Sequence, residues 1–356
     1  MRTHLIAATC LLTPANAYAE NVSVVDQIGT SHTITVEQQQ LGPSAESTVS
    51  IHQEGSAHTA RVSQKALSWR SAATIDQTGN SQEAYVEQHS DPGSNDAGIS
   101  QSGIGNHATV RQFATEFGGQ YADIEQAGQG NLAEVEQSGQ AAGSIILQTG
   151  GGNLARSTQY TFAAGASSEI NQHGSYNEVD VRQATSFQLA ISDVNQLGQD
   201  NAALVQQNAA FAMQEVVINQ EGMENIAEIT QGGGYASADA DVDQNGGGNE
   251  LKLLQDGGDM NSFATISQSG AGNKAEAYQT GFGTVNTLVI IQDGFDNIAA
   301  LTQTGVFSNI DGEIHQTGFL NVASLRQSSS EFGNLVYTIL QTGTGNVAHV
   351  VQSTGP

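Results

Sequence analysis

The chain has 356 residues, of which only 13% are charged and 6% are aromatic, whereas Gly alone contributes 41 residues. Its 36 Asp and Glu outweigh its 10 Lys and Arg, which gives a formal net charge of −26 at pH 7. This excess of negative charge argues against nucleic acid as a partner, because binding to phosphates needs clustered cations. The composition is typical of low-complexity disorder, but the regular placement of Gln, Gly and Asn favours an ordered repeat protein.

The N-terminal segment, residues 1–19, is predicted to be a secretory signal peptide. Arg2 precedes an apolar stretch over residues 5–12, and Ala17 and Ala19 supply small side chains at the cleavage spacing. The apolar stretch is too short to span a bilayer. We therefore expect the mature chain to be secreted and extracellular, and not embedded in a membrane.

The mature chain predicted from this cleavage covers residues 20–356. It carries nine Lys and Arg against 36 Asp and Glu, a net charge of 9 − 36 = −27, because Arg2 is lost with the signal. Cys10, the only cysteine, also lies in the signal, so we expect no disulfide in the mature protein. A lipoprotein signal at Cys10 is the weaker interpretation, because Thr9 stands where Gly or Ala is preferred.

A repeat of about 24 residues fills the whole predicted mature chain. Each repeat contains a Gln that is followed two residues later by Gly, and we take this Gln as position 0. Fourteen repeats follow one another and leave no room for a separate catalytic domain. The fourteen residues at position 0 are Gln27, Gln53, Gln77, Gln101, Gln126, Gln148, Gln172, Gln196, Gln220, Gln244, Gln268, Gln292, Gln316 and Gln341.

Other positions of the repeat are almost as regular. A second Gln stands at position +11 and Ile or Val at position −2 in all fourteen repeats, and Ala stands at position +7 in eleven. His32, His58 and Gln82 occupy position +5 in the first three repeats, and Asn occupies it in the other eleven. These are Asn106, Asn131, Asn153, Asn177, Asn201, Asn225, Asn249, Asn273, Asn297, Asn321 and Asn346.

The spacing predicts two β-strands in each repeat. Positions −2 and 0 share one face of an extended segment, and positions +7, +9 and +11 share one face of a second. Gly at +2 and Asn at +5 tolerate positive φ, so we expect them to frame a tight turn between the strands. Turn glycines of this kind are Gly103, Gly128, Gly198, Gly270 and Gly343. The predicted fold class is all-β, with a single β-solenoid or cross-β stack of about fourteen strand-turn-strand repeats over residues 20–356.

Stacking of successive repeats explains the choice of side chains. A single two-stranded unit is marginal in water, but stacked repeats bury Ile and Val and place each Gln and Asn over its copy as a side-chain amide ladder. A lone buried amide costs about 1 to 3 kcal/mol, whereas a stacked copy satisfies it. Cations at equal positions between carboxylates support this register. The triplets are Glu87, Arg111 and Glu136; Glu134, Arg156 and Asp180; and Glu228, Lys252 and Glu276.

The pattern Gln-x-Gly-x-x-Asn-x-Ala-x-x-x-Gln is intact at residues 101–112, 126–137, 268–279 and 341–352. It resembles the repeat of the curlin family, and the resemblance covers all fourteen repeats. Curlins are exported through a dedicated outer-membrane pore and assemble with a nucleator into amyloid fibres of the bacterial biofilm matrix. The resemblance implies a secreted structural subunit that self-assembles into curli-like functional amyloid fibres for surface adhesion, with a nucleator subunit and the outer-membrane curli secretion pore as partners.

Two features differ from the familiar curlins. The chain has more repeats, and it enters the first repeat directly after Ala19, where curlins carry a Gln- and Gly-rich segment that targets the pore. The export route therefore stays open. So does the role of the chain as main subunit, nucleator or divergent relative.

Other functions have less support in the sequence. His32 and His58 stand in the Asn position and are interpreted as substitutes in the polar ladder instead of metal ligands. We expect no enzymatic activity, no cofactor and no metal site. The alternative function is a monomeric secreted β-solenoid that binds a surface or a polysaccharide. An outward Thr array would indicate it, but position +10 mixes Glu, Arg, Thr, Leu and Tyr.

The last repeat, residues 339–352, is as regular as the middle ones, whereas the first has His32 in place of Asn. Natural β-proteins usually protect an exposed strand edge, and solenoids do so with atypical terminal repeats. The regular last repeat therefore predicts an uncapped edge that acts as a template for the next molecule. We expect the C-terminal end to be the better growth face, and a Pro at Ala348 to block it.

Overall fold

The computed structural model describes residues 21–40, 46–66, 70–211, 213–233, 237–257, 261–282, 285–306, 309–330 and 334–354. The predicted signal peptide and Cys10 lie outside these residues. The described chain consists of β-strands and their connections, and it has no helix long and apolar enough for a membrane crossing. It divides into two compact units, unit 1 (Met1–Tyr176) and unit 2 (Asn177–Pro356).

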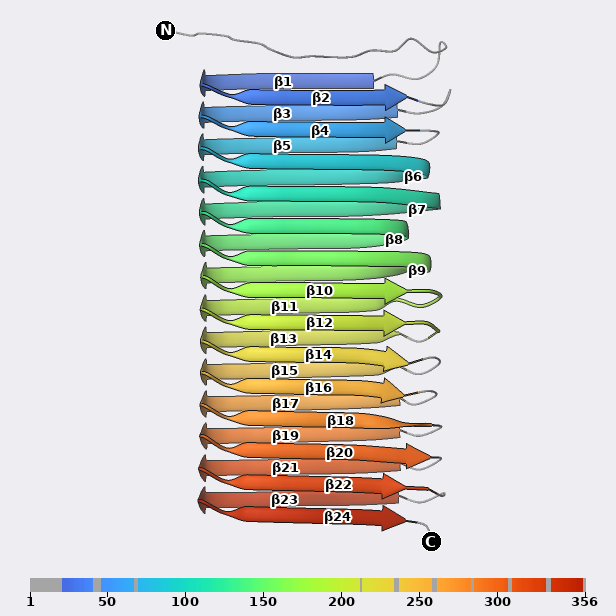
Figure 1. Ribbon diagram of the computed structural model, residues 1–356, viewed down its shortest axis with the longest axis vertical. Helices are drawn as coiled ribbons and strands as arrows, with labels where there is room; N and C mark the ends of the chain where they lie inside the picture. The colour runs from blue at the N-terminus through green and yellow to red at the C-terminus, as the bar shows by residue number, and fades with distance from the viewer. Residues whose placement is uncertain are drawn as a thin grey trace. The chain divides into compact units, whose positions relative to one another are not determined.

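The described residues of unit 1 form nine strands, which Figure 1 shows in blue to green. We call the strand that carries position 0 the first strand of a repeat, and the strand that carries position +11 the second. Strands β6 to β9 each run from the second strand of one repeat into the first strand of the next. The strands are β1 (Asn21–Thr30), β2 (Thr33–Gln40), β3 (Glu46–Ser56), β4 (Thr59–Ala66), β5 (Arg70–Asn80), β6 (Glu83–Ile104), β7 (His107–Gln129), β8 (Leu132–Gly151) and β9 (Leu154–Ser175).

In unit 2, the part of the chain that the structure describes forms fifteen strands, which alternate between second and first strands along the chain. They are β10 (Glu178–Thr185), β11 (Ala190–Gln199), β12 (Ala202–Ala209), β13 (Gln214–Met223), β14 (Ile226–Gly233), β15 (Ala238–Gly247), β16 (Glu250–Gly257), β17 (Asn261–Ala271), β18 (Lys274–Phe282), β19 (Val285–Phe295), β20 (Ile298–Val306), β21 (Asn309–Phe319), β22 (Val322–Ser329), β23 (Asn334–Thr344) and β24 (Val347–Thr354).

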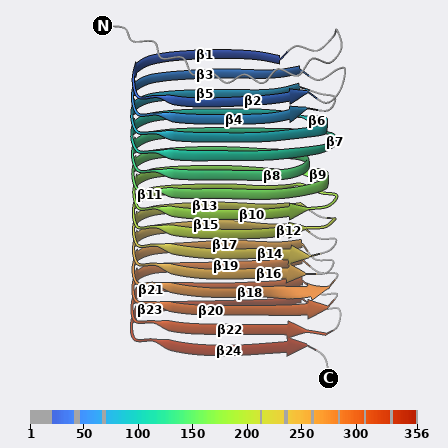
Figure 2. The same ribbon diagram turned by 45° about the horizontal axis from the view of Figure 1, so that its top comes forward.

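Strands within each unit pair in parallel with the equivalent strand of the neighbouring repeat. In unit 1, β3 pairs with β5 and places Gln53 opposite Gln77. In unit 2, β17 pairs with β19 and places Gln268 opposite Gln292. First strands therefore form one layer and second strands form another, as Figure 2 shows for β11 and β13 against β10 and β12. The predicted all-β solenoid of stacked strand-turn-strand repeats is confirmed.

The core lies between the two layers and follows the period of two. In β5, buried and more exposed side chains alternate, and Ile75 at position −2 is only 1% exposed. Ile51 and Ile99 are as deeply buried in unit 1, and Ile218 and Ile266 in unit 2. Because like positions lie side by side, these aliphatic side chains form continuous apolar columns.

Position +2 of the turn requires glycine. Its φ lies between 104° at Gly270 and 131° at Gly29, and Gly103, Gly128, Gly198 and Gly343 fall within this interval. A Cβ atom on an interior glycine of this column, such as Gly103, would overlap the carbonyl oxygen of the equivalent glycine in the next repeat. The backbone conformation and the close approach of the next repeat thus both exclude a side chain.

The second residue with positive φ is at position +4, one residue before the expected Asn. Its φ lies between 52° at Asp296 and 68° at Gly152, and eight of the fourteen residues at this position are not glycine. Among the described residues, none of the eleven Asn at position +5 has positive φ. The prediction that Asn supplies the turn conformation is therefore wrong, and Asn contributes to the turn through its side chain instead.

Candidate functional site

Both Gln of each repeat take part in columns of side-chain amides. In unit 1, Nε2 of Gln53 donates to Oε1 of Gln77 at 2.8 Å. In unit 2, Nε2 of Gln220 donates to Oε1 of Gln244 at 2.7 Å. Each donation runs toward the repeat that follows. The position 0 column contains Gln27, Gln53, Gln77, Gln101, Gln126, Gln148 and Gln172 in unit 1, and Gln196, Gln220, Gln244, Gln268, Gln292, Gln316 and Gln341 in unit 2.

The same amides also tie the two layers together. Gln220, which is 1% exposed, donates its other Nε2 hydrogen to the carbonyl oxygen of Ala202 on a second strand, at 3.0 Å. Gln255 at position +11 donates to the carbonyl oxygen of Asp239 on a first strand at 3.2 Å, and to Oε1 of Gln279 at 2.9 Å. Both N–H groups and the oxygen of an interior amide have partners, so its burial leaves no unsatisfied polar group.

The Asn at position +5 form a third column, in which donation runs toward the preceding repeat. The backbone N–H and Nδ2 of Asn249 both donate to Oδ1 of Asn225, at 3.2 and 3.1 Å. Nδ2 of Asn249 also donates to the carbonyl oxygen of Gly270 in the following repeat, at 3.2 Å. The column contains Asn106, Asn131 and Asn153 in unit 1, and Asn177, Asn201, Asn225, Asn249, Asn273, Asn297, Asn321 and Asn346 in unit 2.

Two histidines occupy the Asn position at the N-terminal edge. The rings of His32 and His58 stack with centroids 5.1 Å apart and an interplanar angle of 2°. Nδ1 of His58 lies 3.3 Å from the backbone nitrogen of Gln82, and Nε2 lies 3.0 Å from the carbonyl oxygen of Glu54. The ring therefore accepts through Nδ1 and donates through Nε2. Burial is the main cause that lowers the pKa of His58 below its ordinary value of 6.5, and the neighbouring His32 also lowers it.

Cations on the outer face lie in register with carboxylates. Each of the three cations singled out in the sequence pairs with the carboxylate of the preceding repeat. The register also places Arg111 beside Glu136 and Lys252 beside Glu276 in the following repeat. The ion pairs are Arg111 with Glu87 (3.9 Å), Arg156 with Glu134 (2.9 Å) and Lys252 with Glu228 (3.5 Å).

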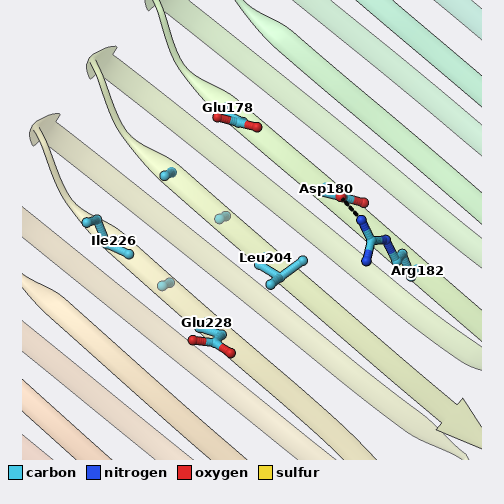
Figure 3. Close-up of a pocket in the computed structure, with 9 residues that line it drawn as sticks. Glu178, Asp180, Arg182, Leu204, Ile226 and Glu228 are labelled. Atoms are coloured by element: carbon cyan, nitrogen blue, oxygen red, sulfur yellow. Dashed lines mark hydrogen bonds and ion pairs between the residues drawn. The ribbon is translucent and has the colours of Figure 1, made fainter.

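A shallow hollow of about 300 Å³ lies on the outer face of β10, β12 and β14. It forms because the small side chain of Ala202 lies between Glu178 and Ile226 on the neighbouring strands. Arg182 turns onto Asp180 at its rim, with an N···O distance of 2.6 Å (Figure 3). Within the described ranges, no three His, Cys, Asp or Glu side chains gather closely enough to hold a metal ion.

The first and last repeats each leave a strand edge without a partner in the described chain. There β1 pairs with β3 and β2 with β4, while β23 pairs with β21 and β24 with β22. Leu340 and Val351 in the last repeat are 74% and 75% exposed. Residues 334–354 contain no Asp, Glu, Lys or Arg, and the first repeat contains only Asp26 and Glu37. Both edges are thus poor in charge.

Two features of this site were missed in the sequence. The first is position +4, where Gly in six repeats was the available signal for a second residue with positive φ. The second is the opposite direction of donation in the Gln and Asn columns, for which a one-dimensional pattern contains no signal. Comparisons with models of known protein families and with curated proteins find no match.

Proposed function

We propose that this chain is a secreted, non-enzymatic structural subunit that polymerises head to tail into curli-like amyloid fibres for surface adhesion and the biofilm matrix. The curlin resemblance supports this function, as well as a nucleator subunit and the outer-membrane curli secretion pore as partners. The observation that carries the proposal is the pair of unprotected edges, whose hydrogen-bonding groups complement each other.

The Gln side chains at the two edges are complementary. Nε2 of Gln341 donates to the carbonyl oxygen of Val322 at 3.1 Å, and its other hydrogen has no acceptor in the described chain. Gln27 donates to Gln53 at 3.0 Å, and no donor reaches its Oε1 in the same residues. Stacking of a second copy with its first repeat on the last repeat would join the Gln341 donor to the Gln27 acceptor. It would continue the column with the geometry of the interior.

The Asn column gives a second match. Oδ1 of Asn321 accepts the backbone N–H and Nδ2 of Asn346, at 3.1 and 2.8 Å. Oδ1 of Asn346 has no such donor within the described residues. In a stacked copy, the backbone N–H of His32 at the same position would supply one. Donors and acceptors therefore match at both kinds of column.

The backbone of the last strand also presents free donors. The backbone N–H of Val322 donates to the carbonyl oxygen of Asn346 in the following repeat, at 2.7 Å. Val347 holds the same position in the last repeat. In a parallel strand, the N–H groups of alternate residues point to opposite neighbouring strands. The N–H groups of outward-facing Val347 and Val351 therefore point to the open edge, whereas that of Ala348 points to β22. A Pro at Ala348 would break a bond inside the molecule, so Val351 is the correct position for blocking growth.

Charge and exposed apolar surface favour the same contact. A mature chain with a net charge of −27 repels its copies along most of its surface. The last repeat brings no carboxylates to the interface, and its exposed Val336 would lie in register with exposed Val22 of the first repeat. Association through these edges buries apolar side chains without opposing two acidic surfaces.

Gly343 and Gly345 provide a matched pair of variants. A Cβ on interior Gly318 would overlap the carbonyl oxygen of Gly343, whereas a Cβ on Gly343 meets only Nδ2 of Asn346, at 3.7 Å. A Cβ on Gly345 has nothing within 4 Å, and Leu320 occupies the same position with φ of 54°. We expect Gly343→Ala to slow elongation about tenfold or more, because its methyl group lies where the next copy must approach. Gly345→Ala should elongate like the unaltered chain.

Elongation of preformed seeds by purified mature chain, followed by thioflavin fluorescence and electron microscopy, measures this difference. Amide exchange of the last repeat verifies that each variant keeps its fold. Val351→Pro, with Val351→Ala as its control, tests the same edge without a residue of positive φ. Equal elongation of all variants would contradict head-to-tail growth. If the unaltered chain stays monomeric, the alternative of a surface- or polysaccharide-binding solenoid is favoured.

A further inference from the structure

The histidines at the N-terminal edge reproduce the hydrogen bonds of the Asn that they replace. Oδ1 of Asn106 accepts the backbone N–H of Asn131 at 3.0 Å, and its Nδ2 donates to the carbonyl oxygen four residues earlier at 2.9 Å. His58 uses Nδ1 for the backbone N–H of Gln82 at 3.3 Å, and Nε2 for the carbonyl oxygen four residues earlier at 3.0 Å. The imidazole is thus a titratable substitute for the amide.

His32 makes the same two contacts one repeat earlier. Its Nδ1 lies 3.4 Å from the backbone nitrogen of His58, and its Nε2 lies 3.2 Å from the carbonyl oxygen of Ile28. The carbonyl oxygen of His58 also accepts the N–H of Thr33 at 2.8 Å. The first repeat is therefore held to the second partly through the two rings, and both bonds through Nδ1 require an unprotonated nitrogen.

We propose that protonation of the His58 ring, which stacks on His32, breaks the ring contacts of the first turns and so opens the N-terminal edge, and that mild acid thereby stops the C-terminal edge of a second copy of the chain from binding there. A protonated ring carries N–H groups on both nitrogens. The Nδ1–H of His58 would face the backbone N–H of Gln82, which Nδ1 now accepts, and the added charge would lie against the stacked His32 ring, 5.1 Å away. The effect on growth rests on the proposed head-to-tail assembly, whereas the opening itself is a property of the single chain.

The surroundings of the pair offer no counter-charge at the rings. Three successive turns pack together here, residues 28–32, 54–58 and 78–82, and Glu54 is their only titratable residue besides the two histidines. Glu54 meets His58 through its main-chain carbonyl. Because the pKa of His58 is lowered in the folded state, the unfolded chain binds protons more readily. The contribution of the neutral His58 ring to the stability of the fold is therefore fully present above its ordinary pKa of 6.5. This contribution is lost as the pH falls through the lowered pKa of the folded state.

Amide exchange of the full mature chain tests the opening without any assembly. The backbone N–H of Gln82 donates to the His58 ring and is present in every variant. Between about pH 7.5 and about pH 5, we expect its protection, corrected for intrinsic exchange, to fall about tenfold in the unaltered chain. A double variant, His32→Asn with His58→Asn, should keep its protection, because Asn fills this position in eleven repeats. His89→Asn, which removes a histidine outside the turn, should behave like the unaltered chain.

Seeded growth supplies the second readout, with the added subunits labelled so that the two fibre ends are distinguished. Growth at the N-terminal edge should slow about tenfold at the lower pH in the unaltered chain, and not in the double variant. An equal loss of Gln82 protection at the lower pH in the unaltered chain and in the double variant would overturn the proposed histidine switch. If the double variant does not fold, His58→Asn alone takes its place with the same expected result for Gln82. Failure of the unaltered chain to polymerise at the higher pH contradicts the proposed function alone, and Gln82 protection then decides the switch.

Discussion

Gln207 on β12 shows how one buried amide depends on its neighbours. It is 2% exposed, and its Oε1 accepts a hydrogen bond from Gln183 at 2.8 Å. Its Nε2 donates to Oε1 of Gln231 at 3.0 Å and to the carbonyl oxygen of Ile191 at 2.9 Å. Loss of this one side chain removes three buried hydrogen bonds at once. Replacement of a buried ladder Gln should therefore cost more stability than replacement of an exposed Gln.

Gln207→Ala and Gln206→Ala make the same chemical change on opposite faces of β12. We expect Gln207→Ala to lower the free energy of local opening of β12 and β14 by about 1 to 3 kcal/mol or more, because it leaves buried polar groups unsatisfied. Gln206 faces outward, so its replacement should change that free energy by less than about 0.5 kcal/mol. Amide exchange resolved by strand measures both values. Similar effects of the two changes would argue against a structural role of the ladder.

Predictions for single residues succeeded where close packing against the next repeat allows almost only one type of side chain. Gly at position +2 lies against the carbonyl oxygen of the equivalent glycine in the next repeat, so no other residue fits there. Glycine therefore recurs at this position in every repeat, and this regularity identifies the turn. Position +4 faces open space in repeats such as that of Gly105, and residues as different as Leu320 and Asp200 adopt positive φ there. This variety hid the position, and the more regular Asn was wrongly given its conformation.

At the scale of strands, the cations are divided unequally between the two layers. Of the nine Lys and Arg after the predicted signal, only Arg70 lies in a first strand, and the other eight lie in second strands. These eight are Arg61, Lys65, Arg111, Arg156, Arg182, Lys252, Lys274 and Arg326. The described first strands of unit 2 therefore carry their carboxylates without a Lys or Arg in the same layer. Burial raises the pKa of Asp239 and Asp241, with further contributions from Glu215 and Asp243, respectively.

Reversal of one cation in a second strand should show the value of the charge register. Lys252→Glu places three carboxylates side by side with Glu228 and Glu276. We expect the free energy of local opening of β16 to fall by about 0.2 to 1 kcal/mol at low salt, because like charges directly opposite repel. Lys252→Gln should cost less. The difference between the two variants should disappear near 1 M salt, and a difference that persists there would point to packing instead of charge.

At the scale of the whole molecule, the two units should respond to acid in opposite directions. His58 in unit 1 has a lowered pKa, so its repeat loses stability as the pH falls below 6.5. Asp239 and Asp241 in unit 2 have raised pKa values, so the folded state binds their protons more readily than the unfolded state. Stability at these two residues is therefore gained as the pH falls through the raised values toward 3.8.

One amide-exchange series between neutral pH and about pH 4 checks both signs in the same sample. Protection of β15, corrected for intrinsic exchange, should rise while that of Gln82 falls. Asp239→Asn with Asp241→Asn should remove the rise in β15 and leave the response of Gln82 unchanged. A fall in β15 that parallels Gln82 would contradict the separate origins of the two responses.

The large-scale architecture was predictable because each unit repeats one small pattern. The period of two at positions +7, +9 and +11 identifies the strands, and the equal spacing of Gln identifies the parallel register. Which neighbour each backbone N–H faces depends on the pairing of a parallel strand, which the pattern alone does not contain. For this reason the sequence pattern favours Ala348 for a blocking Pro, although Val347 and Val351 carry the N–H groups that face the open edge.

The opposing directions of the amide columns restrict how copies can meet. In the proposed head-to-tail contact, the NH₂ of Gln341 meets the oxygen of Gln27, and the oxygen of Asn346 meets the backbone N–H of His32. This contact, as proposed, joins two different surfaces of the chain. A heterologous contact of this kind, repeated along one axis, does not return to its starting point. If the proposed contact forms, the supply of subunits, and not symmetry, sets how many copies a fibre contains.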